Sequence, residues 1–91
     1  MVRNEIKSFL DIPNVGHAIE KDFVLLGIKQ PIELAAKDPY RMYEDLCNVT
    51  GKRHDPCVID VFISAVRYMQ GGPAKNWWEY TKERKIKLGS K

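Results

Sequence analysis

The segment between Phe9 and Ile19 contains the residues whose types and order best suit the binding of an anion. Within it, the turn Pro13-Asn14-Val15-Gly16 is followed at once by a stretch with helical apolar spacing that begins at His17. A tight turn that leads directly into a helix leaves several backbone N–H groups without partners inside the helix. Those groups point outward together at the positive end of the helix dipole and can bind one phosphate diester. Lys21, one helical turn after His17, adds a positive charge for the same phosphate.

The same segment resembles the helix-hairpin-helix motif of DNA-binding proteins, which usually reads apolar residue, Pro, Gly, apolar residue, Gly. Ile12, Pro13, Val15 and Gly16 match this pattern, and Asn14 replaces the first glycine. Asparagine is the least unfavourable replacement at a left-handed position, so we expect the turn geometry to survive. In this interpretation Val15 is a buried knob between the two helices, and Gly16 lets nucleic acid approach closely. Phosphate contacts carry no base information, so such binding would be independent of sequence.

A second, degenerate copy of the hairpin follows along the chain. A helix over residues 39–48, a turn over residues 49–54 and a helix over residues 55–69 repeat the same order, with residues 31–36 as the connector. This second turn is longer and lacks the apolar-Gly ending, so its phosphate contact would depend on the side chains of Lys52 and Arg53. Paired hairpins in known families form a compact four-helix unit with a pseudo-twofold axis, whose turns can meet both strands of a duplex.

Degenerate hairpins of this kind also serve as packing units or as surfaces for protein contacts, and two functions therefore remain open. In the first, the amides of Asn14–His17, aided by Lys21, Lys52 and Arg53, bind the DNA backbone. In the second, the same fold binds a protein partner through the tryptophan-containing helix or the apolar hairpin surface.

Other clusters of reactive side chains fit known chemistry poorly. Cys47, His54 and Cys57, with His17 as a fourth ligand, have the right atoms for zinc but match no standard spacing. We therefore expect no metal ion and no cofactor. A thiolate–imidazole pair of Cys57 and His54 is conceivable, but nothing in the chain resembles an oxyanion hole, and we expect no enzymatic activity.

The tryptophan pair near the C-terminus allows two interpretations. Trp77 and Trp78 lie just before Tyr80 and a basic stretch, Lys82–Lys91. In the first interpretation one ring seals the small core, the other lies half exposed, and the basic stretch is a frayed, solvated end. In the second, the rings form a stacking platform for the bases of a single strand, beside positive charges that attract its phosphates.

Helical spacing is plentiful along the chain and strand signals are weak, which predicts an all-α protein. Asp38-Pro39 and Asp55-Pro56 each combine an N-cap carboxylate with a first-turn proline, and Gly27 and Gly51 suit helix ends. The predicted helices cover about residues 4–10, 17–26, 31–36, 39–48, 57–68 and 74–85.

Length and composition set the outer limits of these interpretations. The chain has 91 residues, of which 44% are hydrophobic and 30% charged, as expected for one globular domain. No apolar run approaches the ~20 residues of a membrane-spanning helix, and no signal-peptide core follows the N-terminus, so we expect a cytoplasmic protein without membrane contact. The net charge of +3 is uneven: residues 1–74 carry nine Lys or Arg and ten Asp or Glu, whereas residues 75–91 carry six and two.

The chain as a whole resembles the small bacterial family named after the pathogenicity locus protein Cdd1, over roughly residues 5–80. The resemblance rests on short motifs: Ile12–Gly16, Leu26–Ile28, Leu46-Cys47, Thr50-Gly51, Asp55–Val58, Asp60–Phe62 and Trp77-Trp78. The family is described as helix-hairpin-helix and is sometimes labelled as mitomycin-resistance related. The resemblance implies a tandem helix-hairpin-helix (SAM-like) bundle of five to six short helices over residues 1–73. A C-terminal helix and basic tail, residues 74–91, would pack on the same domain, and we expect a monomer or weak homodimer.

Overall fold

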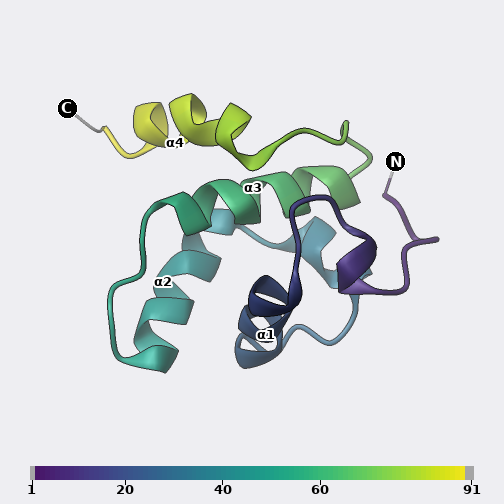
Figure 1. Cartoon of the computed structure of the whole chain (residues 1–91), viewed down its shortest axis with the longest axis horizontal. Coiled ribbons are helices and arrows are strands. Elements are labelled where there is room, and N and C mark those ends of the chain that lie inside the picture. The colour runs from purple at the N-terminus through teal and green to yellow at the C-terminus, as the bar shows by residue number, and fades with distance from the viewer. Residues whose placement is uncertain (1, 90–91) are drawn as a thin grey trace.

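The structure, a computed structural model that describes residues 2–89, consists of helices, and no strand occurs among these residues (Figure 1). The all-α prediction is therefore confirmed. Residues 2–89 contain four α-helices: α1 (His17–Leu25), α2 (Pro39–Thr50), α3 (Cys57–Met69) and α4 (Thr81–Lys87). Three short 3₁₀ helices accompany them: η1 (Phe9–Asp11), η2 (Pro31–Ala36) and η3 (Trp77–Tyr80).

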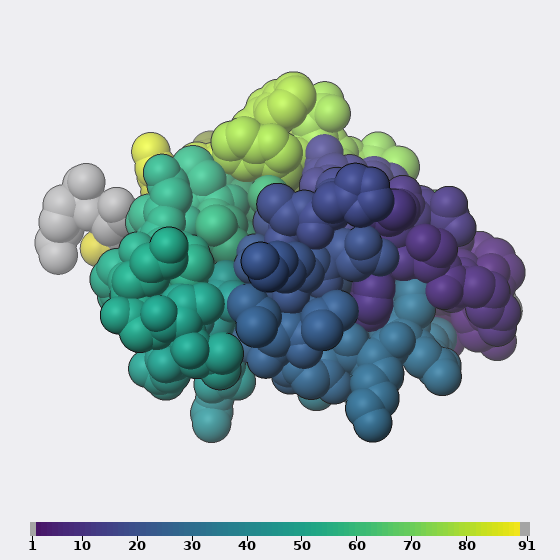
Figure 2. Space-filling view, turned by 60° about the horizontal axis from the view of Figure 1, so that its bottom comes forward, coloured from purple at the N-terminus to yellow at the C-terminus, as the bar shows by residue number. Residues whose placement is uncertain are grey.

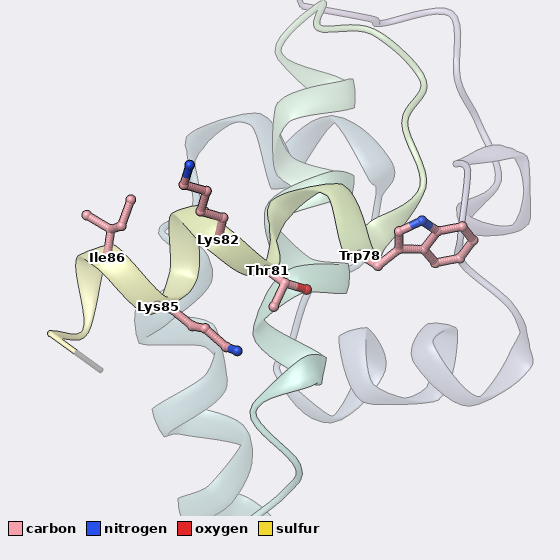
Figure 3. Close-up of a pocket in the computed structure, with 5 residues that line it drawn as sticks. All are labelled: Trp78, Thr81, Lys82, Lys85 and Ile86. Carbon is pink, nitrogen blue, oxygen red and sulfur yellow. The ribbon is translucent and has the colours of Figure 1, made fainter. Parts of the chain in front are cut away.

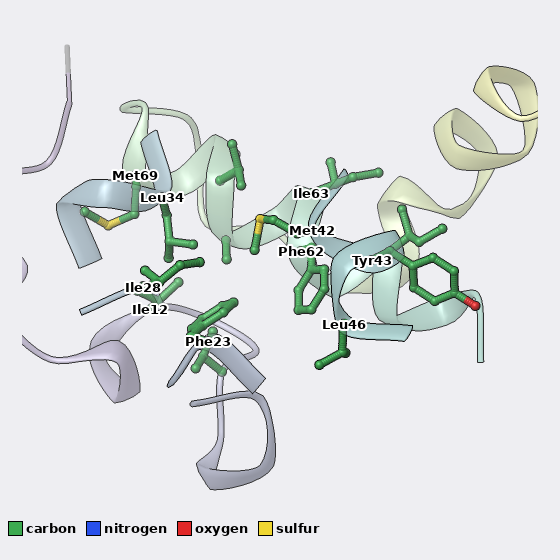
Figure 4. Packing of buried hydrophobic residues seen from close by; sticks show 14 of the residues in the cluster. Ile12, Phe23, Ile28, Leu34, Met42, Tyr43, Leu46, Phe62, Ile63 and Met69 are labelled. Atoms are coloured by element: carbon green, nitrogen blue, oxygen red, sulfur yellow. The ribbon is translucent and has the colours of Figure 1, made fainter. Parts of the chain in front are cut away.

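The central element is α3, which packs against α2, η2, η3 and α4. Apolar residues follow one another almost all round this helix, which predicts a buried helix rather than a surface one. Phe62 of α3 is completely buried and lies 5.8 Å, between ring centroids, from Phe23 of α1. Phe23 in turn lies 5.1 Å from Phe9 of η1. This row of rings, visible in part in Figure 4, joins the first hairpin to the central helix.

Both Asp-Pro pairs lie at helix starts; Asp38 is the N-cap of α2 as predicted, whereas in α3 Pro56 occupies the N-cap and Asp55 precedes it. The Asp38 carboxylate accepts a hydrogen bond from the Tyr40 N–H at 2.9 Å at the start of α2. The Asp55 carboxylate accepts one from the Cys57 N–H at 2.8 Å at the start of α3. Gly51, with φ at 72°, ends α2 in the left-handed conformation that glycine adopts most easily.

The helix predicted over residues 4–10 is wrong, because only η1 forms in this region. Ser8 is extended, at φ −123°, and its side chain accepts a hydrogen bond from the Leu10 N–H, so a helix can begin only after it. Residues before Ser8 are held by non-local contacts instead. The Arg3 N–H donates to the carbonyl of Met69, and the Arg3 guanidinium donates to the carbonyls of Tyr68 and Gly72.

The predicted start of the last helix at residue 74 is also wrong. Asn76 and Glu79 form a reciprocal capping box that begins η3 at Trp77, and α4 follows at Thr81. The residue buried in the core is Tyr80, with 5% of its surface exposed, whereas Trp77 is half-buried and Trp78 is 57% exposed. The expectation that a tryptophan ring seals the core is therefore corrected.

The expectation of a frayed, solvated end over Lys82–Lys91 is wrong for most of that stretch; residues 90 and 91 lie outside the described residues. Residues up to Lys87 are helical, and Arg84 is buried, with its Nε donating to Asp60 Oδ1 at 2.7 Å. Thr81 Oγ1 donates to the other oxygen of the same carboxylate at 2.6 Å. Because Asp60 belongs to α3 and is completely buried, its bonds with Arg84 and Thr81 attach α4 to the centre of the domain.

Candidate nucleic-acid interface

The Pro13–Gly16 turn has the left-handed residue that its sequence predicted, but the prediction that all the amides of Asn14–His17 are free donors is wrong for Val15, whose N–H is paired inside the turn. Asn14 adopts φ 71°, and it is the one non-glycine residue in the left-handed region among residues 2–89. Val15 is 7% exposed and belongs to the hydrophobic core, so its predicted burial is confirmed. The Val15 N–H donates to the carbonyl of Ile12 at 3.1 Å, which closes the turn just before α1 begins.

Asn14 has a second function that the motif comparison missed. Its side-chain amide donates to Ser64 Oγ of α3 at 2.8 Å and to the carbonyl of Lys75 at 2.7 Å. These partners lie 50 and 61 residues away in the sequence. The turn is thereby fastened to α3 and to the segment that leads into η3. A glycine, the usual residue of the motif, could not make either contact.

The N-terminus of α1 carries free hydrogen-bond donors. Within the described part of the chain, no hydrogen-bond acceptor pairs with the N–H groups of Gly16, His17 or Ala18, and all three residues are exposed. The first amide that is paired inside the helix belongs to Glu20, which donates to the Gly16 carbonyl at 2.9 Å. A Cβ atom added at Gly16 would meet nothing within 4 Å. The space beside Gly16 is therefore open.

Charged side chains surround this open N-terminus unevenly. The His17 ring is exposed, and its Nδ1 lies 3.5 Å from a carboxylate oxygen of Glu20 in the first turn of α1. Lys21 is exposed on the same helix. The next residue, Asp22, is partly buried; burial raises the pKa of its carboxyl, and the nearby His54 and Lys21 lower it in part. The helix itself packs against α2.

In the second hairpin, the backbone N–H groups at the N-terminus of α3 already have hydrogen-bond partners, unlike those at the N-terminus of α1. At the N-terminus of α3, the Cys57 N–H donates to the Asp55 carboxylate, and the Val58 N–H donates to the Asp55 carbonyl. The Ile59 N–H donates to the carbonyl of Pro56. The hydrogen bond from the Cys57 backbone lowers the pKa of the Asp55 carboxyl, so this cap carries a negative charge at neutral pH. A phosphate would have to displace this carboxylate.

The two cations predicted for the second hairpin differ in their surroundings. Arg53 makes two hydrogen bonds to the Glu44 carboxylate, at 3.1 and 3.3 Å, and its guanidinium lies 5.7 Å from the centre of the Tyr43 ring. Lys52 is exposed. Figure 2 presents α1 and α2 side by side on one face of the molecule. The structure thus groups residues 14–17 with Lys21 at the first hairpin and leaves Lys52 and Arg53 in the loop after α2.

The cysteines and histidines do not converge. No group of three or more His, Cys, Asp or Glu side chains within residues 2–89 could hold a metal ion. Cys47 is buried, and His54 Nε2 lies 2.8 Å from Thr50 Oγ1. Burial raises the pKa of the Cys57 thiol, which is the opposite of what an activated nucleophile needs. Among the described helices, none is long and apolar enough to span a lipid bilayer.

Comparison with known proteins gives one consistent result. The family model described as "Cdd1: Pathogenicity locus" matches residues 2–86. The curated protein "Mitomycin resistance protein McrB" of Streptomyces lavendulae is 36% identical over 85 residues, which are 93% of this chain and 81% of that relative. No solved structure matches the chain significantly. With nearly its whole length matched, the chain belongs to the Cdd1 pathogenicity locus family.

Proposed function

We propose that this protein is a non-enzymatic helix-hairpin-helix module that binds the phosphate backbone of DNA without base preference. The observation that carries the proposal is the set of exposed, unpaired N–H groups of Gly16, His17 and Ala18 at the N-terminus of α1. A phosphate oxygen in front of them would accept their hydrogen bonds and meet the positive end of the helix dipole. Contacts to phosphate fix the position of a protein on DNA but read no base.

Gly16 supports the proposal because the free protein does not need a glycine there. Its φ of −104° is open to any residue, and a side chain would meet no neighbour. Glycine at a helix N-cap is also a weaker cap than Ser, Thr, Asp or Asn. Close approach of an external group to the backbone accounts for a glycine at this position.

The charges around the N-terminus of α1 partly cancel, so we expect weak binding of DNA. Lys21 and the exposed Lys52 attract a polyanion, whereas Glu20 beside His17 opposes it and Arg53 is already paired with Glu44. We therefore expect a dissociation constant in the range typical of non-specific complexes, roughly 10⁻⁴ to 10⁻⁶ M at physiological salt. Two neutralised phosphates correspond to a slope of about −2 when the logarithm of the binding constant is plotted against that of the salt concentration.

The test is a titration of a fluorescently labelled DNA duplex at several salt concentrations. Wild type is expected to bind with the slope given above, and Gly16→Glu is expected to abolish binding while leaving the helical content unchanged. Glutamate at this position fills the open space and places a negative charge at the phosphate site. Ala36→Glu, an equal change of charge at an exposed position at the end of η2, is the matched control and should bind like wild type.

The alternative function is a protein-interaction module, and a specific feature favours it. Trp78 and Ile86 are large apolar residues that are 57% and 71% exposed. Absence of duplex binding even at low salt, or a binding constant that does not respond to salt, would refute the proposal and favour this alternative. A reducing, cytoplasmic setting suits both functions, because Cys47 and Cys57 are unpaired thiols.

A further inference from the structure

The exposed face of the C-terminal helical segment combines an aromatic ring with positive charges. Trp78, Thr81, Lys82, Lys85 and Ile86 line a shallow hollow of about 480 Å³ on this face (Figure 3). Lys82 and Lys85 extend to either side of α4, and the Trp78 ring lies at its beginning. No acidic residue lines the hollow. We propose that this face, the α4 platform, binds a single-stranded segment of DNA by stacking one base on Trp78 and pairing flanking phosphates with Lys82 and Lys85.

Lys82 and Lys85 give the platform its positive charge, and the two nearest acidic residues have partners outside it. The Glu79 carboxylate accepts a hydrogen bond from the Asn76 N–H in the capping box. The Glu83 carboxylate pairs with Arg67 of α3. Lys82 and Lys85 are exposed, and no ion pair involves them within residues 2–89. The surface therefore complements a polyanion that also offers flat apolar faces, which describes an unpaired nucleic acid strand.

The platform is held rigidly, so stacking a base on Trp78 would cost little conformational entropy. Arg84 and Thr81 both bond to the buried Asp60, which fixes the rotation of α4 on α3. The Trp77 ring meets the Trp78 ring edge-on at a centroid distance of 5.6 Å. This contact constrains Trp78 without covering it, since Trp78 remains 57% exposed.

The platform follows the first hairpin's contact with Lys75 in the chain, and it rests on the proposed function in taking DNA as its ligand. Asn14 of the hairpin turn donates to the carbonyl of Lys75, three residues before Trp78. One strand could thus place a phosphate at Gly16 and an unpaired base on Trp78. A base inside an intact duplex presents no free face, so the platform selects single-stranded or frayed DNA.

The test compares three labelled probes of equal length: oligo-dT, the same backbone with abasic sites throughout, and a blunt duplex. Base–aromatic stacking predicts that Trp78→Ala weakens oligo-dT binding roughly 5- to 150-fold. The same variant should bind the abasic strand and the duplex like wild type, because both lack an accessible base. Trp78→Phe, which keeps a stacking face, should retain most of the affinity for oligo-dT.

The contribution of Lys82 and Lys85 is measured separately, by the salt dependence of oligo-dT binding. The double variant Lys82→Ala, Lys85→Ala should make the salt slope for oligo-dT shallower by about 1.4, since each phosphate contact on a single strand contributes about −0.7. The exposed Lys37→Ala serves as the control for charge. All variants change exposed side chains, and circular dichroism checks that they fold.

The outcomes separate this inference from the proposed function. If Trp78→Ala leaves oligo-dT binding unchanged while Gly16→Glu abolishes duplex binding, the platform is refuted and the hairpin proposal stands. If Trp78→Ala weakens oligo-dT binding and Gly16→Glu has no effect on any probe, the platform is supported and the hairpin proposal fails. Equal weakening of oligo-dT and abasic binding by Trp78→Ala would overturn the stacking inference.

Discussion

Asp60 and Arg84 form an ion pair inside the domain, with 2.7 Å between Oδ1 and Nε. Asp60 is completely buried in α3, and Arg84 of α4 is 9% exposed. Thr81 donates to the second carboxylate oxygen, so each oxygen of the buried carboxylate has a donor. A buried charge is tolerable only under such conditions, because its desolvation is costly without partners. The pair makes α4, and with it Trp78, an integral part of the domain.

Breaking this pair from the α4 side is expected to destabilise the protein strongly. Arg84→Met keeps the packing of the side chain but leaves the Asp60 carboxylate buried without a cation, at a cost of about 3–5 kcal/mol in the free energy of unfolding. Urea unfolding measures this cost. The double variant Asp60→Leu, Arg84→Met should recover most of the loss, since no charge is then buried.

Lys85→Met is the control for this prediction, because Lys85 is exposed one residue further along α4. We expect its free energy of unfolding to stay within about 0.5 kcal/mol of wild type. An Arg84→Met variant as stable as Lys85→Met would mean that the buried pair does not hold α4.

A second prediction concerns Asn14, where the motif and the structure disagree about the best residue. Glycine fits the left-handed φ of 71° without strain, yet it would leave Ser64 and the Lys75 carbonyl without the Asn14 amide. Asn14→Gly is therefore expected to lower the free energy of unfolding by about 1–3 kcal/mol. Urea unfolding of wild type and variant decides the point. A variant of equal or greater stability would show that backbone conformation alone determines the choice at position 14.

Much of the fold is predictable from local signals in the sequence. The Asp-Pro pairs at residues 38 and 55 and the left-handed Gly51 set the limits of α2 and the start of α3 through contacts within a few residues. The Pro13–Gly16 turn and the buried Val15 follow from the hairpin pattern in the same way. Such signals predict structure well because the hydrogen bonds that fix these features join residues close to one another in the sequence.

Features that depend on distant partners escaped prediction. The contacts of Asn14 span 50 and 61 residues, and Arg84 pairs with a residue 24 positions earlier. An arginine in a basic stretch looks solvated until its partner is known. Asp60 was the available signal, since a carboxylate within the most apolar helix needs a buried partner. The pairing of Arg53 with Glu44 was hidden for the same reason, because the two residues lie nine positions apart across a turn.

A third prediction uses the raised pKa of Asp22. Burial raises its pKa above the ordinary value of 3.8, so the folded state holds the proton more tightly than the unfolded state. Between pH 3.8 and the higher folded pKa, the contribution of Asp22 to stability therefore falls as the pH rises. Asp22→Asn is expected to be more stable than wild type at pH 7, and the advantage should shrink as the pH falls toward 4.

Urea unfolding between pH 4 and pH 7 measures this difference. Asp11→Asn, at an exposed carboxyl in η1, is the matched control. A lower stability of Asp22→Asn at pH 7 would show that the attraction of His54 and Lys21 to the carboxylate outweighs the cost of burying it.

A fourth prediction tests whether the ion pair with Glu44 keeps Arg53 from binding DNA. Glu44→Gln removes the partner of Arg53 and frees its guanidinium on the exposed side of the loop. In the duplex titration, affinity should rise, and the salt slope should become steeper by about 0.9, which is the contribution of one additional neutralised phosphate. Asp45→Asn is the control: it removes the same charge from the neighbouring residue, whose partner is Arg41 of the same helix. A slope that steepens equally in both variants would mean that net charge alone, rather than release of Arg53, governs binding at this loop.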